Sequence, residues 1–277
     1  MNTAILITCY NRKEVTLNTL KTLSIAINNI PSIKFDIYLV DDGSPDGTGE
    51  AVENVFPYIN VIKGDGTLFW GGGTNLAWYT AVQNKDYDYY LWCNDDSLLY
   101  EDALETMFRT LNNRDNVIVC GAFQSAVNNA PTYGGRQSET LIPLSPNGTN
   151  ELSFTYLNGN LVLIPRKVFK ANGYISKIFR QAMGDRDYGL RAVGNKIEMF
   201  LSDKYVGTCE RHDNLIHPWA NPKKKLLQRL KILYSPLGMN PYVRACYHYR
   251  HSSVNKAICA FIGLNFQAIF PFLFRKN

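Results

Sequence analysis

Two adjacent carboxylates, Asp95 and Asp96, are the side chains of this sequence best suited to hold a metal ion. They follow Asn94 and an apolar run over residues 87–93, which has the length and composition of a buried strand. Adjacent carboxylates repel one another unless a cation neutralises them, and oxygen ligands favour Mg²⁺ or Mn²⁺. Magnesium commonly binds one or two carboxylates together with substrate phosphates. The alternative is that either aspartate only caps the turn before the next helix.

A second acidic pair, Asp41 and Asp42, follows the apolar run over residues 35–40 and precedes Gly43. A carboxylate here can accept hydrogen bonds from the imide N–H of a pyrimidine base or from ribose hydroxyls, while the glycine lets the backbone turn. An ordinary Asp-Gly turn is the alternative. Because both acidic pairs follow strands, we expect them at the same edge of a sheet, which favours a binding role.

Residues 64–75 form a glycine-rich stretch that contains Trp70. It is not a P-loop, because no Gly-Lys-Ser/Thr follows, and Phe69 stands where a dinucleotide fingerprint requires its last glycine. Glycines that lead into a helix still let the backbone approach a phosphate or a sugar, and the helix N-terminus favours an anion. A flexible loop is the alternative, and Trp70 can either stack on a sugar or pack in the core.

Asp185 begins a predicted helix over residues 185–193 and is the candidate general base. A general base must lie within reach of the hydroxyl from which it removes a proton. The alternative is that Asp185 caps the helix. For Asp187 we favour a structural role, since Arg191 follows one helical turn later and can pair with it.

Apolar runs alternate with helical patterns along the first part of the chain. Strands are predicted over residues 4–9, 35–40, 60–63, 87–93, 117–121 and 161–164. Asn11 is predicted to cap the first helix, and Thr74 to cap a helix that ends near Asn84. This order predicts an α/β fold with a mostly parallel central sheet and helices on both faces, in which ligands bind beyond the C-terminal strand ends.

The composition excludes several classes of protein. With 45% hydrophobic and 19% charged residues, the 277-residue chain resembles neither a disordered chain nor a multi-span membrane protein. A formal charge of +5 is too small to indicate nucleic-acid binding. The six cysteines form no Cys-x-x-Cys pair, so free thiols are expected. Because no signal-peptide pattern follows Met1, the catalytic part is expected in the cytoplasm.

The chain changes character at residue 218, so we predict a main domain over 1–217 and an appended helical unit over 218–277. Three lysines at 223–225 precede an amphipathic segment, and a strongly apolar segment follows near the C-terminus. This last segment is nearly long enough to span a bilayer, but its polar residues and proline favour an interfacial or packed helix. Residues 223–277 are therefore expected either to contact anionic lipid as a peripheral anchor, or to complete the fold or form a homodimer contact.

The order of these motifs resembles glycosyltransferase family 2, inverting enzymes of the GT-A fold, over about residues 3–215. The motifs that carry the resemblance are Cys-Tyr-Asn-Arg at 9–12, Asp-Asp-Gly-Ser at 41–44, the glycine-tryptophan stretch, Asn-Asp-Asp at 94–96 and Gly-Asp-x-x-Tyr-x-x-Arg at 184–191. The resemblance implies a nucleoside-diphosphate sugar as donor, linked to UDP or dTDP, and Mn²⁺ or Mg²⁺ as cofactor.

The resemblance also assigns roles to individual residues. It places Thr8 and Asp42 at the nucleotide base, Asp95 near the ribose, Asp96 at the metal and Asp185 at the catalytic base. Further nucleotide-sugar-binding residues are expected at Tyr10, Asn11, Arg12, Asp41, Asp65, Gly66, Trp70, Gly72, Asn75 and Asn94. His212 is a second candidate metal ligand, although an isolated histidine is more often structural.

The expected reaction is a single displacement that inverts the anomeric configuration, with a glycan or lipid-linked hydroxyl as acceptor and a role in surface polysaccharide synthesis. Gly184 stands where many members of the family have glutamate, which leaves the acceptor class open. The glycine-tryptophan stretch resembles members that transfer deoxysugars such as rhamnose, with a hexose as the alternative. Two other functions remain: a sugar-phosphate nucleotidyltransferase, whose expected glycine loop is lacking near the first strand, and a nucleotide-sugar-binding protein without turnover.

Overall fold

The computed structural model describes residues 1–138, 142–211 and 218–274. Its strands are β1 (Asn2–Cys9), β2 (Lys34–Asp41), β3 (Asn60–Lys63), β4 (Tyr89–Cys93), β5 (Leu98–Leu99), β6 (Val117–Gln124), β7 (Pro131–Tyr133), β8 (Leu161–Pro165) and β9 (Glu198–Thr208). Its helices are α1 (Lys13–Asn28), α2 (Thr48–Val55), α3 (Phe69–Asn84), α4 (Ala103–Leu111), α5 (Arg166–Asn172), α6 (Gly184–Gly194), α7 (Leu226–Leu233), α8 (Pro241–His251) and α9 (Val254–Ile269). Two 3₁₀ turns are η1 (Pro218–Ala220) and η2 (Pro271–Phe274).

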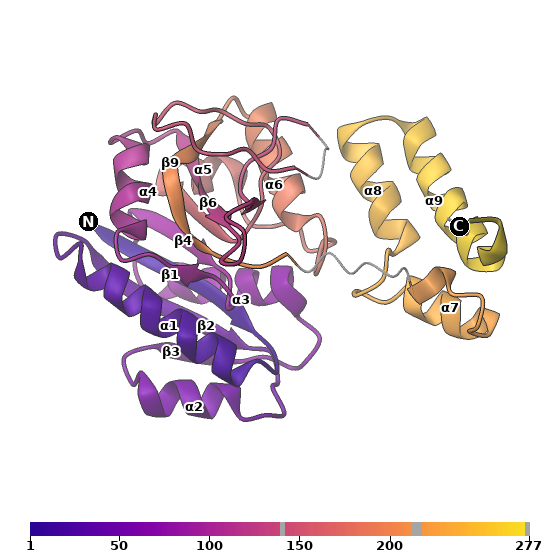
Figure 1. The fold of residues 1–277 in the computed structure, drawn as a ribbon, viewed down its shortest axis with the longest axis horizontal. Helices are drawn as coiled ribbons and strands as arrows, with labels where there is room; N and C mark the ends of the chain where they lie inside the picture. Colours follow the sequence, from indigo (N-terminus) through magenta and orange to yellow (C-terminus); the bar gives the residue numbers. More distant parts are fainter. Residues whose placement is uncertain (139–141, 212–217, 275–277) are drawn as a thin grey trace.

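Within the described residues the strands form one sheet in the order β3-β2-β1-β4-β8-β6-β9-β5, with β7 paired to β6 (Figure 1). Strands β1 to β4 pair in parallel, and so do β6 and β9. The expected α/β fold is therefore confirmed, but the sheet is mixed, because β8 runs antiparallel between β4 and β6. Two neighbouring strands can be parallel only if a crossover connection, usually a helix, joins them. The described part of the segment between β6 and β8 contains no helix, which agrees with their antiparallel pairing.

The core lies on both faces of the sheet, as expected for strands covered by helices on each side. Along β1, Ile5 and Ile7 pack with α1 and α4 on one face, while Ala4 and Leu6 pack with α3 on the other. Successive residues of a strand point to opposite faces, which explains why a continuous apolar run is buried throughout. The sheet is thus held rigidly, and its C-terminal strand ends have fixed positions.

Helix α3 begins earlier than the sequence predicted. Thr74 lies inside the helix, where its hydroxyl donates to the carbonyl of Trp70 at 2.7 Å, so it does not cap the N-terminus. The carboxylate of Asp42 accepts hydrogen bonds from the amides of Leu68 and Phe69, at 3.3 and 2.8 Å. A helix N-terminus needs such acceptors for its first amides. The cap is supplied by the residue that follows β2, far away in the sequence, and local pattern could not reveal it.

The first helix also begins differently, at Lys13 with Arg12 as its N-cap residue. Asn11 has a positive φ of 53°, and its amide donates to the hydroxyl of Ser44 at 2.9 Å. It was predicted to cap the helix, but it turns the chain between β1 and α1.

All six cysteines are free, as expected.

Residues 218–277, called here the C-terminal extension, place α7, α8 and α9 on the far side of α6 from strands β1 to β3 (Figure 1). Helix α8 packs through Tyr247 against Phe179 and Met183, next to the start of α6. Helix α7 and α9 share a small core of their own around Trp219 and Leu233. Among the described helices, none combines the length and apolar character needed to cross a bilayer.

Candidate active site

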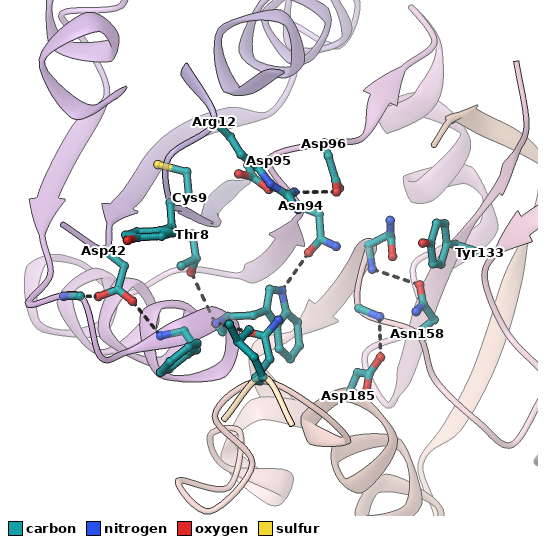
Figure 2. A pocket seen from close by; sticks show the side chains of 18 residues that line it. Thr8, Cys9, Arg12, Asp42, Asn94, Asp95, Asp96, Tyr133, Asn158 and Asp185 are labelled. Carbon is teal, nitrogen blue, oxygen red and sulfur yellow. Dashed lines mark hydrogen bonds and ion pairs between the residues drawn. The ribbon is translucent and has the colours of Figure 1, made fainter. Parts of the chain in front are cut away.

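A cavity of about 750 Å³ opens where β1, β2 and β4 end (Figure 2). We call it the first cavity, and its lining residues are Thr8, Cys9, Tyr10, Arg12, Asp42, Gly66, Phe69, Trp70, Asn94, Asp95, Asp96, Tyr133, Asn158, Gly159, Asn160, Gln181, Asp185 and Leu237. Residues from all the motifs of the sequence therefore meet at one site. This follows from the parallel pairing, because the C-terminal ends of parallel strands lie at one edge of the sheet.

The acidic pair after β4 converges on one guanidinium. Nη1 of Arg12 lies 3.2 Å from Oδ1 of Asp95 and 2.8 Å from Oδ2 of Asp96 (Figure 2). Burial raises the pKa of Asp95 to about 7, Arg12 opposes this rise, and the neighbouring Asp96 adds to it. Since both carboxylates reach the same point in space, they can also hold a divalent cation together with phosphate oxygens.

Two carboxylates fit a magnesium or manganese ion that takes its remaining ligands from a diphosphate and water. The described residues contain no cluster of three or more His, Cys, Asp or Glu side chains that could hold a metal without substrate. Besides Arg12, the thiol of Cys209 contacts Asp96, at 3.8 Å. The predicted ligand His212 lies outside the described residues.

Asp42 organises the glycine-rich loop. Its side chain is only 3% exposed, and it accepts hydrogen bonds from the amides of Gly66 at 2.9 Å and Phe69 at 2.8 Å, besides that of Leu68. Gly66 needs its positive φ of 81° to bring this amide inward. Figure 2 shows Asp42 and Asp185 at opposite sides of the cavity. Asp42 therefore holds one wall of the cavity in place.

Five of the predicted binding residues do not line the first cavity: Asn11, Asp41, Asp65, Gly72 and Asn75. Asp41 accepts hydrogen bonds from the amides of Ser44 and Gly49, both at 3.0 Å, and so fixes the turn into α2. Asp65 is exposed and accepts from the amide and hydroxyl of Thr67. These two carboxylates shape the loops that carry the cavity wall.

Asn75 and Gly72 belong to α3. The amide side chain of Asn75 donates to the carbonyl of Ile175 at 2.8 Å and accepts from its amide at 3.1 Å. A side chain at Gly72 would meet Leu68 at 3.3 Å. Asn75 thus ties α3 to the chain at Ile175, and Gly72 leaves room for Leu68 at the start of the helix.

Trp70 lies between the two ends of the cavity. Its indole N–H donates to Oδ1 of Asn94 at 2.8 Å, and its ring packs edge-on against Trp92 with centroids 5.7 Å apart. A Cβ atom added to Gly159 would lie 2.5 Å from the Trp70 ring and 3.4 Å from Cβ of Asp185. Because Gly159 has no side chain, both Trp70 and Asp185 can pack against its backbone.

Asp185 lies in the first turn of α6. One carboxylate oxygen accepts from the amide of Arg186 at 2.8 Å and the other from the amide of Gly159 at 3.2 Å. Burial raises the pKa of Asp185, and Arg186 and the two amides only partly oppose this effect. A raised pKa makes a carboxylate a stronger base for an acceptor hydroxyl. Asp187 pairs with Arg191 at 2.9 Å, which confirms its predicted structural role.

Several lining residues were not predicted from the sequence. Asn158, Gly159 and Asn160 directly precede β8, and Gln181 precedes α6. Because β8 is antiparallel to β4, its beginning lies at the edge where the parallel strands end. The sequence offered one signal for these residues, the Asn-Gly-Asn turn before an apolar run. Only the direction of β8 shows that this turn lies at the cavity. Leu237, from the C-terminal extension, carried no such signal.

The chain was compared with known proteins. Residues 4–173 match the family described as Glycosyl transferase family 2. Over 127 residues the chain is 28% identical to the uncharacterized glycosyltransferase YfnE of Bacillus subtilis (strain 168), a match that covers 44% of the chain and 30% of that relative. The chain thus spans less than a third of the length of that curated relative.

Two solved structures share the fold. The first is S. aureus TarS 1–349 in complex with UDP-GlcNAc, with a TM-score of 0.57 and 15% identity over 98% of this chain and 81% of that one. The second is the mannosyltransferase PcManGT from Pyrobaculum calidifontis in complex with GDP-Man and Mn²⁺, with a TM-score of 0.55 and 13% identity over 95% of this chain and 74% of that one. The predicted GT-A fold is confirmed. Since the family match covers more than half of its length, the chain belongs to glycosyl transferase family 2.

Proposed function

We propose that the protein is an inverting, metal-dependent glycosyltransferase that moves a sugar from a nucleoside diphosphate to an acceptor hydroxyl. One observation carries this proposal: the first cavity joins the acidic pair Asp95 and Asp96 to a carboxylate of raised pKa, Asp185, at its other side. A donor diphosphate at the acidic pair and an acceptor hydroxyl at Asp185 would place the anomeric carbon between them. That arrangement suits an in-line displacement.

Each residue has a task in this reaction. Asp96 and Asp95 would hold the metal, and Mn²⁺ or Mg²⁺ bound there would supply positive charge to the leaving diphosphate. Asp185 removes the proton of the acceptor hydroxyl as its oxygen attacks the anomeric carbon. The bond to the diphosphate breaks on the opposite face, so the configuration inverts. Trp70 and Asn94, joined by their hydrogen bond, lie where the sugar must pass.

For the donor, we propose a UDP- or dTDP-linked sugar, with a deoxyhexose as the first candidate and a hexose as the second. The solved structures of similar fold contain UDP-GlcNAc and GDP-Man, so nucleotide-sugar donors suit this architecture. We further propose a glycan or lipid-linked acceptor in surface polysaccharide synthesis, at the cytoplasmic side of the membrane. In this proposal residues 1–217 form the catalytic domain and residues 218–277 a separate unit.

The donor can be identified by incubating the protein with a panel of nucleotide sugars and Mn²⁺, and by measuring the release of nucleoside diphosphate. We expect release from one donor, its loss with a chelator, and its loss in Asp96→Ala, since removing a ligand should weaken metal binding by about 100-fold or more. Asp115→Ala, which removes an exposed carboxylate outside the first cavity, serves as the control and should behave as wild type. Metal-dependent donor binding without release would instead support a binding protein without turnover.

We propose that the C-terminal extension docks on an anionic membrane surface. Ile258 and Ile262 of α9 and the neighbouring Phe272 are exposed, although large apolar side chains are normally buried. Arg229 of α7 donates to the carbonyl of Ala268 at 2.7 Å, which brings the lysines that precede α7 close to the end of α9. An apolar face beside a cluster of lysines matches the interface of a bilayer that contains anionic lipid.

Co-sedimentation with phosphatidylglycerol vesicles tests this docking. We expect the protein to bind these vesicles and not phosphatidylcholine vesicles, and the double variant Ile262→Asp/Phe272→Asp to bind at least about tenfold more weakly. Val127→Asp, which alters an exposed apolar residue outside the extension, should bind as wild type. If neither vesicle binds and light scattering gives the mass of a dimer, the apolar face is a homodimer contact.

A further inference from the structure

A second cavity, of about 600 Å³, adjoins the first cavity at Asp185. It shares Asn158, Gln181 and Asp185 with the first cavity. Its remaining lining residues are Arg136, Leu157, others of the 177–186 segment, and residues within 236–244 of the C-terminal extension. Asp185 therefore lines both cavities, whereas the acidic pair Asp95 and Asp96 lines only the first.

The charges around the second cavity are strongly unbalanced. Five cationic side chains line it: Arg136, Lys177, Arg180, Arg186 and Arg244. Asp185 is the single carboxylate among the lining residues, and burial raises its pKa, which favours its neutral form. Like charges gathered around a concave surface repel one another, and this repulsion is relieved when an anion binds.

Four of these cations, Arg136, Lys177, Arg180 and Arg186, have no ion pair with any described carboxylate within 4.0 Å. For Arg136 the lack of a partner is clearest: its Nε is buried and has no hydrogen-bond partner in the described structure. Burial and the nearby charge of Arg186 lower the pKa of Arg136. A buried donor without an acceptor costs free energy, so this guanidinium is prepared for a ligand that accepts hydrogen bonds.

Several arginines elsewhere in the described chain pair with carboxylates. Arg109 donates to both oxygens of Asp203 at 2.9 Å, and Arg166 lies 2.6 Å from Asp86. The four cations of the second cavity without a described ion pair instead lie together, and their cavity adjoins the candidate base. A chance distribution of surface charge does not explain this, because Arg136 and Arg186 come from different parts of the chain and still meet at the same cavity.

Resting on the proposed glycosyl transfer, we propose that the second cavity binds the acceptor through phosphate groups adjacent to the sugar whose hydroxyl meets Asp185. The planar fork of a guanidinium matches two phosphate oxygens, and phosphates carry enough charge to offset several cations. Ile178, Met183 and Val243 add an apolar part to the lining, which suits a hydrocarbon chain next to the phosphates. The shared chemistry is a phosphate beside an accepting sugar, either in a lipid-linked diphosphate or in a phosphodiester polymer.

Calorimetric titration of the full-length protein, in a chelating buffer that keeps metal from the first cavity, tests this assignment. The probes are octyl diphosphate and, as the uncharged counterpart, octyl glucoside. We expect the diphosphate to bind, the glucoside not to bind, and Lys177→Ala/Arg180→Ala to weaken diphosphate binding by about 100-fold, or about tenfold for each cation removed. Both side chains are exposed and make no described ion pair, so the variant should fold.

The control variant Lys167→Ala/Lys170→Ala removes two cations from α5, outside both cavities, and should bind octyl diphosphate as wild type does. Equal binding by Lys177→Ala/Arg180→Ala and wild type, or equal binding of octyl glucoside and octyl diphosphate, would overturn the assignment. A glycerol-phosphate trimer that displaces octyl diphosphate would identify a phosphodiester polymer as the source, and failure to displace it would identify a lipid diphosphate.

The outcome is independent of the donor experiment. Suppose that no nucleotide sugar is bound or turned over, but the binding of octyl diphosphate still depends on Lys177 and Arg180. The proposal of glycosyl transfer is then wrong, and the proposal of an anion site stands. If a donor is turned over but the two cations have no effect on diphosphate binding, the transfer stands and the acceptor assignment is wrong.

Discussion

Replacing Asp185 with asparagine should lower the rate of sugar transfer by about 100- to 10,000-fold, the usual contribution of a general base. Asparagine has the size of aspartate and keeps one oxygen, which can accept from the amide of Arg186, so the start of α6 should stay in place although the weaker hydrogen bond from Gly159 is lost. Donor affinity should therefore be unchanged. Single-turnover kinetics, together with a separate measurement of donor binding, would resolve the two effects.

The pH dependence of the wild-type rate is a second test of Asp185 as the general base. Since burial raises the pKa of Asp185, the carboxylate form required for catalysis is lost as the pH falls, and this loss begins at a higher pH than for a free aspartate of pKa about 3.9. The rate should therefore rise with pH along a limb that Asp185→Asn lacks. An unchanged rate and pH profile in Asp185→Asn would mean that another group accepts the proton.

Replacing Asp187 with asparagine should destabilise the protein by about 3–5 kcal/mol, as expected when one partner of a buried ion cluster is removed. Asp187 is fully buried and binds Arg191 of its own helix at 2.9 Å, and Arg250 and His251 of α8 at 2.6 and 2.9 Å. It thereby ties the C-terminal extension to α6. Urea denaturation followed by tryptophan fluorescence measures the loss of stability.

A matched control for this variant is Asp203→Asn, which removes a carboxylate that accepts from Nε and Nη2 of Arg109 on a more exposed part of the surface. An exposed pair of this kind contributes about 0–1 kcal/mol. If Asp187→Asn were no more destabilising than this control, Asp187 would not be the link that holds α8 in place.

The pH dependence of stability should follow the sign of the pKa shift of Asp187. Burial alone would raise the pKa of Asp187, but hydrogen bonds from His251, Arg250 and Arg191 outweigh it and lower the pKa. The resulting stability is present above the pKa of an unfolded aspartate, about 3.9, and is lost as the pH falls toward the lower folded value. Wild type should thus lose stability over this acidic range, and Asp187→Asn should lose less.

The parts of the fold that local pattern determines could be predicted from the sequence. The strand over residues 60–63 was predicted with the bounds of β3, and the first two strands were each placed within one or two residues. The residues after these strands converge on the first cavity, because parallel pairing brings their ends together. The division at residue 217 stays a prediction.

The remaining features depend on contacts between distant residues. The beginning of α3 is set by Asp42, which lies 27 residues before Phe69, and so the first amides of the helix find an acceptor that no local motif contains. The inverted direction of β8 places Asn158 and Gly159 at the cavity, and strand direction is not encoded in an apolar run. Helix α8 was not predicted, because its apolar residues meet α6 only in the folded chain.

The walls of the second cavity come from both parts of the protein, and this has an evolutionary consequence. The residues that face the acidic pair belong almost entirely to the first 217 residues, whereas the wall over residues 236–244 belongs to the extension. Exchange of the extension between related genes would thus supply a new wall for the acceptor and leave the donor machinery intact. A lineage could in this way diversify the glycans it builds while keeping the same supply of activated sugar.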